Sequence, residues 1–107
     1  MKKYLDLSQT ARLITMGFSE PKSVHKLSLD IDMDTVPHFG YSIGDLIDFL
    51  PKEIYDEDEN VTASLQITSG WEVVYTTYAD IFYYQKNEEL IDALFNMVVQ
   101  LKEKGLI

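Results

Sequence analysis

The stretch NEELIDALFNMVVQLKEKG, Asn87–Gly105, decides how the rest of the chain must fold. Asn87 is a good helix N-cap, because its side-chain carbonyl can accept a hydrogen bond from an unpaired N–H of the first turn. Glu88 and Glu89 then place negative charge at the positive end of the helix dipole. Gly105 can adopt the left-handed conformation that ends a helix. These signals predict one uninterrupted C-terminal helix.

The apolar arc of this helix is wider than one covering layer requires. The polar stripe occupies only about a quarter of the circumference. It consists of Glu89, Asp92, Asn96, Gln100 and Glu103. A helix that lies on one sheet needs an apolar arc of roughly 100° or a little more, and this arc is about twice as wide. We therefore expect a second surface over Phe95 and Val99, either a helix of the same chain or a partner subunit. Domains usually bury such stripes on their own neighbouring elements, which favours the first.

The composition indicates one globular domain without a linker. The 107 residues are enough for a hydrophobic core, and the absence of cysteine excludes disulfides and thiolate zinc sites. No run of about 18 apolar residues predicts a membrane span. The first residues lack the apolar segment of a signal peptide, so we expect a cytoplasmic protein.

The charge of the chain limits its partners. The net charge is −9, with an isoelectric point near 4.4. Acidic chains repel phosphate backbones and anionic lipid surfaces, so nucleic acid and membranes are not expected partners. A basic protein partner is compatible with this charge, although solubility alone explains it.

The N-terminal half predicts two short helices and one edge strand. Ser8 can cap a helix that runs to Met16, and Ser42 can cap a second helix that runs to Leu50. Val24–Asp32 alternates in its second half, which is typical of a half-buried strand, and its outward charges suit a sheet edge. The apolar residues expected to face the core are Leu7, Ala11, Ile14 and Phe18; Leu27, Leu29 and Ile31; and Ile43, Leu46, Ile47 and Leu50.

Two alternating segments further on predict a β-hairpin. They are Val61–Thr68 and Trp71–Thr76. A two-residue loop at Ser69-Gly70 would place apolar side chains of one strand opposite polar side chains of the other. A three-residue loop, Thr68-Ser69-Gly70, pairs Ile67 with Trp71 and brings both apolar sets to one face, with the glycine at the left-handed position. Residues 52–60, which contain the acidic run 56–59, are expected to be a connection.

The expected fold is α+β. We predict a small antiparallel sheet of about three strands, with two short helices and one long C-terminal helix packed on one face. Residues 78–84 either prolong the second hairpin strand or form a third strand.

Three stretches of the sequence, taken together, carry a family resemblance. They are TARLITMGF (Thr10–Phe18), YSIGDLIDFLPKEI (Tyr41–Ile54) and ELIDALFNMVVQLKEKGLI (Glu89–Ile107). With the W-x-V-x-Y pattern that begins at Trp71, the chain resembles a group of small uncharacterised proteins of Bacteroides-type bacteria and their prophages. The resemblance implies a bacterial cytoplasmic setting and a mobile element. It transfers no activity, cofactor or catalytic residue.

Motifs for metal or cofactor chemistry are incomplete. The spacing Asp30-x-Asp32-x-Asp34 opens like a calcium-binding EF-hand loop, but Thr35 and Tyr41 occupy the positions that require glycine and glutamate. The two histidines, at positions 25 and 38, have no helical or strand-spaced histidine partner. We therefore predict no metal site and no cofactor.

Aromatic residues are the unusual feature of the composition. Seven tyrosines, five phenylalanines and one tryptophan concentrate in two segments, 39–41 and 71–84. They supply either the core of a small sheet or a recognition surface, since aromatic residues are enriched at interfaces. The residues predicted for such an interface are Trp71, Tyr75, Tyr78, Phe82, Tyr83, Tyr84, Phe95 and Val99.

Three hypotheses for function follow from these patterns. The preferred one is a small acidic binding or adaptor module that does not catalyse a reaction and that self-associates or binds another protein. The second is a small-ligand or enzymatic site around His38, Asp34 and Tyr41, in which the histidine acts as acid or base. The third is an acidic mimic of nucleic acid that occupies a basic protein.

Overall fold

The computed structural model describes residues 2–21 and 40–107. Within them the chain is α+β, as predicted. The helices are α1 (Leu7–Thr15), α3 (Ile43–Phe49) and α4 (Leu90–Glu103), and the strands are β1 (Glu53–Asp56), β2 (Val61–Thr68), β3 (Glu72–Thr76) and β4 (Ile81–Lys86). The strand predicted at Val24–Asp32 lies outside the described residues, as do both histidines and the spacing Asp30-x-Asp32-x-Asp34.

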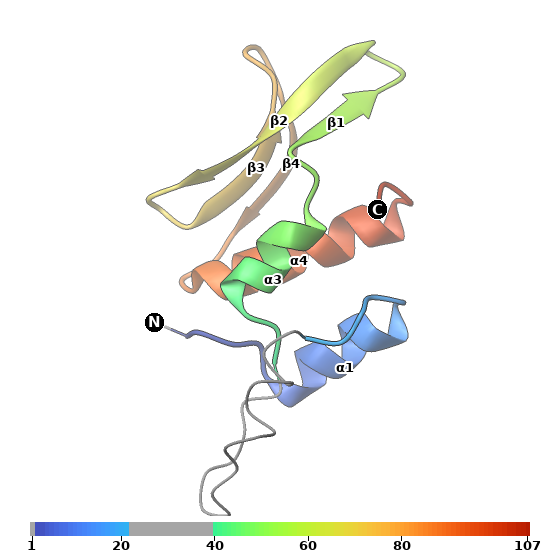
Figure 1. Cartoon of the computed structure of the whole chain (residues 1–107). Coiled ribbons are helices and arrows are strands. Elements are labelled where there is room, and N and C mark those ends of the chain that lie inside the picture. The colour runs from blue at the N-terminus through green and yellow to red at the C-terminus, as the bar shows by residue number, and fades with distance from the viewer. Residues whose placement is uncertain (1, 22–39) are drawn as a thin grey trace, which may run out of the picture.

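The sheet has four antiparallel strands in the order β1-β2-β3-β4 (Figure 1), one more than the three expected. The additional strand is β1, which sequence analysis assigned to a connection. It is only four residues long, and only Ile54 among them is buried, so it shows no alternation that could be recognised. Ile54 pairs with Ala63 of β2 and adds to the core. The segment after β3 forms β4 as a separate strand.

The β2–β3 hairpin has the predicted loop length but is displaced by one residue. Thr68 pairs with Glu72 and Ile67 pairs with Val73, so the loop is Ser69-Gly70-Trp71 rather than Thr68-Ser69-Gly70. Trp71, at φ 55°, adopts the left-handed conformation that we assigned to the glycine. A left-handed non-glycine residue costs about 1–2 kcal/mol. Packing of the indole against the core offsets this cost. The displacement moves the partner of each β2 residue by two positions along β3, so the same side chains of the two strands still share a face. The predicted core face of the hairpin is therefore confirmed.

Helix α4 lies between the sheet and the other helices, and it is the centre of the molecule. Figure 1 shows it across one face of the sheet, with α3 and α1 on its other sides. Nine of its 14 residues are buried: Leu90, Ile91, Ala93, Leu94, Phe95, Met97, Val98, Val99 and Leu101. Phe95 faces α1, since the guanidinium carbon of Arg12 lies 6.0 Å from the centroid of its ring. The predicted second surface is therefore supplied by helices of the same chain.

The polar stripe of α4 is also in contact with other parts of the chain. The Lys2 ammonium donates to Asp92 Oδ1 at 2.8 Å, and the Gln85 amide donates to Gln100 Oε1 at 2.9 Å. Nearer the end of the helix, Arg12 donates to Glu103 Oε1 at 3.2 Å. Helix α4 is therefore held by other segments of the chain on its polar side as well as on its apolar side.

The ends of the helices differ from the predicted caps at two places. Asn87 does not cap α4: its side chain accepts the Glu89 N–H at 3.1 Å, and the helix begins after Glu89. Asp6, rather than Ser8, caps α1, because Asp6 and Gln9 exchange the two hydrogen bonds of a capping box. The capping box at Ser42 and Asp45 is confirmed, and Gly105, at φ 74°, follows the end of α4 as predicted.

The buried face of α1 was predicted wrongly. Thr10 and Leu13 are buried, whereas Leu7 is 76% exposed and Ile14 is 43% exposed. The helix therefore turns a narrower face to its neighbours than its apolar residues suggested. Helix α1 is an outer layer next to α4, so one of its sides remains exposed (Figure 1).

Tyr75 is fully buried in β3, where its hydroxyl donates a hydrogen bond to the carbonyl oxygen of Pro51 at 2.6 Å. Burial raises the pKa of Tyr75 to about 12. Because the folded pKa exceeds the unfolded value, this residue contributes stability that is complete below pH 10 and is lost as the pH rises through about 12.

We predict that Tyr75→Phe lowers the free energy of unfolding at neutral pH by about 1–2 kcal/mol, because the Pro51 carbonyl loses its donor. The difference in the free energy of unfolding between wild type and variant should shrink as the pH rises from the unfolded pKa of Tyr75 to its folded pKa. Urea unfolding at a series of alkaline pH values measures it. A difference that stays constant through this range would contradict the assignment of the shifted pKa to Tyr75.

Candidate binding surface at strand β4 and the end of the sheet

Strand β4 forms one outer edge of the sheet. Within the part of the chain that the structure describes, β3 is its single neighbouring strand. Its sequence, IFYYQK, carries no charge before Lys86, and that lysine lies 4.0 Å from the carboxylate of Glu72 on β3. An edge strand presents unpaired backbone N–H and C=O groups, and charged side chains normally protect it from pairing with other chains. Most of β4 lacks this protection.

The opposite edge is protected. Strand β1 has only four residues, and two of them, Glu53 and Asp56, are acidic. Short length and charge both discourage the addition of another strand. The two edges of the sheet therefore differ, and β4 is the one suited to pairing.

A β-bulge determines how the aromatic residues of β4 are directed. Tyr83 pairs with Tyr75, and Ile81 pairs with Thr76. Because Tyr75 and Thr76 are consecutive in β3, Phe82 is an extra residue of β4 with no pairing partner in β3. A bulge re-aims the side chains next to it. Phe82 and Tyr83 both reach the helix-facing side of the sheet, where they pack against the core. Tyr84 lies on the other face, opposite Val74.

The predicted interface residues divide into three groups. Tyr75, Phe95 and Val99 belong to the core of this chain. Trp71, Phe82 and Tyr83 are partly buried and pack against that core. Tyr78 is fully exposed in the β3–β4 turn, and Tyr84 is 44% exposed. Of the predicted set, these last two present the most surface to a partner.

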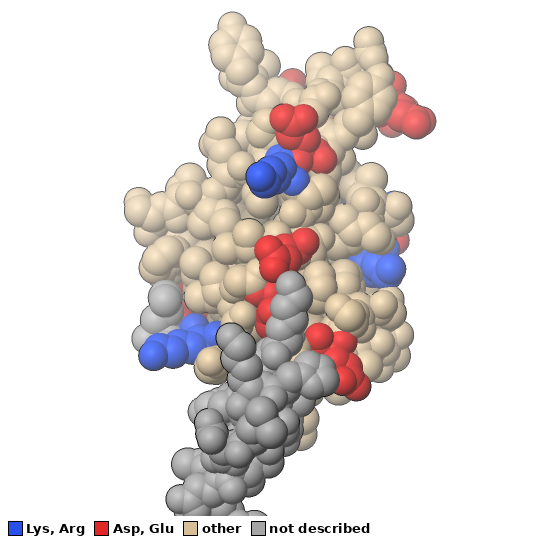
Figure 2. Space-filling model, viewed as in Figure 1, with Lys and Arg blue, Asp and Glu red and all other residues tan. Residues whose placement is uncertain are grey.

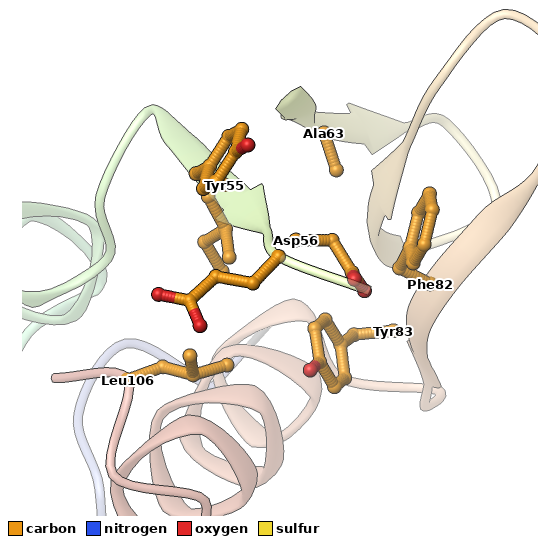
Figure 3. A pocket seen from close by; sticks show the side chains of 8 residues that line it. Tyr55, Asp56, Ala63, Phe82, Tyr83 and Leu106 are labelled. Atoms are coloured by element: carbon orange, nitrogen blue, oxygen red, sulfur yellow. The ribbon is translucent and has the colours of Figure 1, made fainter. Parts of the chain in front are cut away.

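A cavity of about 280 Å³ lies at one end of the sheet. Its lining residues are Ile54, Tyr55, Asp56, Glu57, Ala63, Phe82, Tyr83 and Leu106. Although β1 and β4 are opposite edges in strand order, both contribute to the walls, because the sheet curls around this end (Figure 3). Figure 3 shows Ala63, Phe82 and Tyr83 around the cavity, with Leu106 beside it from the C-terminal segment.

Several residues of this surface could not be selected from the sequence. Ile81 is 64% exposed at the start of β4, and Ala63 and Leu106 line the cavity. Ala63 and Leu106 are 43 positions apart, and no local pattern links them. The bulge at Phe82 also leaves no recognisable signal in the sequence.

Of the alternative site around His38, Asp34 and Tyr41, only Tyr41 is described. Its ring is completely buried, and its hydroxyl donates to the carbonyl oxygen of Ser19 at 2.6 Å. Burial, together with the charges of Asp45 and Glu20, raises the pKa of Tyr41. These contacts give Tyr41 a structural role in joining the α1–α3 region.

The acidic run 56–59 spans the last residue of β1 and most of the turn to β2. Asp56 Oδ1 accepts the N–H groups of Asp58 and Glu59 at 2.9 and 3.1 Å, and Asn60 follows in the left-handed conformation at φ 54°. On the face shown in Figure 2, acidic side chains occur as separate groups with basic ones nearby. A mimic of nucleic acid needs carboxylates in a continuous row, and this face does not show one.

Residues 2–21 and 40–107 contain neither a candidate metal site nor a helix that could span a membrane. No group of three or more histidine, cysteine, aspartate or glutamate side chains in these ranges could hold a metal ion. The longest helix described, α4, has 14 residues, and no described helix has the length and apolarity that crossing a membrane requires.

Comparison with protein-family models, with curated proteins and with solved structures gives no match for this chain. The resemblance to small proteins of Bacteroides-type bacteria and their prophages therefore stays a prediction from the sequence.

Proposed function

We propose that this chain is a small acidic binding module that acts through protein contacts and self-associates by pairing strand β4 with β4 of a second copy. The observation that carries the proposal is the largely uncharged outer edge of β4, beside which no further strand lies among residues 2–21 and 40–107. Backbone pairing along such an edge would extend the sheet across two chains. Cytoplasmic location belongs to the same proposal and rests on the sequence pattern.

A second copy is the occupant that fits this edge best. Two identical strands pair antiparallel about a two-fold axis, so the same backbone groups are satisfied on both sides. The exposed side chains of Ile81 and Tyr84 lie along the strand and would add apolar contact. By contrast, α4 is already covered by its own chain, so its apolar arc is not available for association.

Contacts inside the chain also account for the described groups whose pKa is shifted. Tyr41 and Tyr75 each donate to a backbone carbonyl. Burial alone would raise the pKa of Asp92, but hydrogen bonds from Lys2 and Gln9 and the charge of Lys2 outweigh it and lower the pKa. These three groups hold elements together, which supports a binding role over acid–base chemistry at their positions.

The test is sedimentation velocity over a range of protein concentrations, with two matched variants. Tyr84→Lys places a charge in the middle of the edge strand, whereas Tyr78→Lys makes the same chemical change in the β3–β4 turn, off the edge. We expect a reversible wild-type dimer. Tyr84→Lys should weaken it at least about tenfold, a loss of about 1.4 kcal/mol. Tyr78→Lys should change it less than about twofold.

Two results would contradict the proposal. A wild-type chain that remains monomeric at every concentration would exclude self-association. A strand of another protein would then be the expected partner of the β4 edge. If Tyr78→Lys weakens the dimer as much as Tyr84→Lys does, the contact lies at the β3–β4 turn and not along the edge of β4. Backbone amides of β4 that gain exchange protection on dimerisation would support pairing along this edge.

A further inference from the structure

The cavity at the end of the sheet combines apolar and aromatic walls with carboxylates. Phe82 and Tyr83 supply ring surfaces, and Ile54 and Ala63 supply aliphatic surface. Asp56 and Glu57 are the charged residues of the lining, and both are acidic. Aromatic faces and carboxylates both attract cations, whereas the aliphatic walls favour carbon groups over water.

We propose that this cavity binds a small organic ammonium ion. An alkylammonium carries a positive charge on an apolar body, which matches the two kinds of surface found here. A metal ion would require converging oxygen ligands, and an anion would be repelled by both carboxylates. The observed lining therefore favours an organic cation over either of these.

The charged wall is preorganised. Asp56 Oδ1 is fixed by the N–H groups of Asp58 and Glu59, so this carboxylate is held in place by the turn. Glu57 is exposed at the same turn, which leaves its carboxylate accessible from solvent. A preorganised charge loses little entropy when the ligand arrives.

The aromatic wall already contacts a cation of the chain itself. The ammonium nitrogen of Lys104 lies 5.8 Å from the centroid of the Tyr83 ring, within the usual range of a cation–π contact. The Tyr83 ring is thus oriented so that a cation lies over it. This contact also places one repulsive charge near the proposed site, so removal of Lys104 should strengthen binding.

The volume limits the size of the ligand. Ligand sites for drug-sized molecules usually enclose about 300–1,000 Å³. A cavity of about 280 Å³ is just below this range, so it suits a ligand such as choline or a short alkylamine. Leu106, one of the lining residues, is 37% exposed.

The experiment is a titration of the full chain followed by NMR, using choline chloride and its neutral isostere 3,3-dimethyl-1-butanol. Sodium chloride at equal ionic strength is the control. We expect saturable shifts at the amides of Ala63, Phe82 and Tyr83 with choline, and binding of the neutral isostere at least about fivefold weaker.

Three variants and one control distinguish the contribution of charge from that of the apolar walls. Glu57→Gln should weaken choline binding about fivefold, whereas Glu88→Gln, the same change at an exposed residue outside the cavity, should leave it unchanged. Phe82→Leu keeps an apolar wall but removes the ring, so it should reduce the preference for choline over the isostere. Lys104→Ala should increase choline affinity about twofold.

The proposal is overturned if choline gives only the shifts that sodium chloride gives. It is also overturned if the neutral isostere binds as tightly as choline, because the site would then recognise apolar volume without charge. If Glu57→Gln and Glu88→Gln lose the same amount of choline affinity, the effect comes from the net charge of the protein, and the proposed site is excluded. These results are measured as ligand titrations, whereas β4 pairing is measured by sedimentation, so failure of one proposal is distinguishable from failure of the other.

Discussion

Replacing Phe95 by alanine is expected to destabilise the fold by about 3–5 kcal/mol, because it empties a covered position between α4 and α1. Phe95 is 7% exposed, and its ring lies under the Arg12 guanidinium. The variant loses the buried ring and also the support that α1 receives from α4. Chemical denaturation of wild type and Phe95→Ala measures the difference.

The matched control is Leu7→Ala on the outer side of α1. Leu7 is 76% exposed, so its truncation should change the free energy of unfolding by no more than about 0.5 kcal/mol. If Phe95→Ala were as mild as Leu7→Ala, α1 would not cover α4 in solution. Burial of α4 against a partner subunit would then explain its wide apolar arc.

Gly40→Ala is expected to destabilise the fold by about 3 kcal/mol, because no room exists for a methyl group at this position. A Cβ built on Gly40 would lie 1.9 Å from the carbonyl oxygen of Leu5. The obstacle is backbone, so a side-chain rotation cannot relieve it. Leu5 is itself buried, and its N–H donates to the Tyr41 carbonyl oxygen at 3.0 Å. Thermal and chemical unfolding both measure the effect.

Gly44 in α3 provides the opposite control. A Cβ there would meet only the Ser42 Oγ at 3.8 Å, an ordinary contact. Gly44→Ala should stabilise the protein by up to about 1 kcal/mol, since alanine is the better helix former. Two glycine-to-alanine changes four positions apart are thus expected to act in opposite directions. Equal effects would contradict the close passage of residue 40 against Leu5.

Elements with strong local signals were predicted well from the sequence. The periodicity of α4 predicted both the helix and the need for a second covering surface, because the angular width of an apolar arc is a property of the sequence alone. Parity likewise predicted which face of the β2–β3 hairpin is buried, although Trp71 replaced Gly70 at the left-handed position. Both features depend on neighbouring residues and need no knowledge of the tertiary fold.

Features set by tertiary contacts were missed. Strand β1 exists because Ile54 pairs with Ala63, and nothing within its four residues indicates this. The bulge at Phe82 and the curl of the sheet bring β1 and β4 to one cavity, and neither leaves a local pattern. The wrong buried face of α1 has the same origin, because Leu7 and Ile14 are apolar but lie on the outer side of an outer helix.

The enclosed position of α4 also determines where function can reside. The apolar arc of α4 is covered within the chain, so it is not available to a partner. Among the described residues, the surfaces left for binding are the outer edge of β4 and the cavity at the end of the sheet. The two proposals use different atoms. Edge pairing uses the backbone of β4, whereas ammonium binding uses side chains on its helix-facing side.

Native-state hydrogen exchange of the α4 amides tests the central claim most directly. A helix enclosed between the sheet and α1 and α3 can open only when the molecule unfolds, so the amides from Ala93 to Leu101 should exchange with the same free energy as those of Val73 and Tyr75 in β3. If these α4 amides exchange with a free energy several kcal/mol below that of β3, the helix is a peripheral element and the enclosed arrangement is wrong.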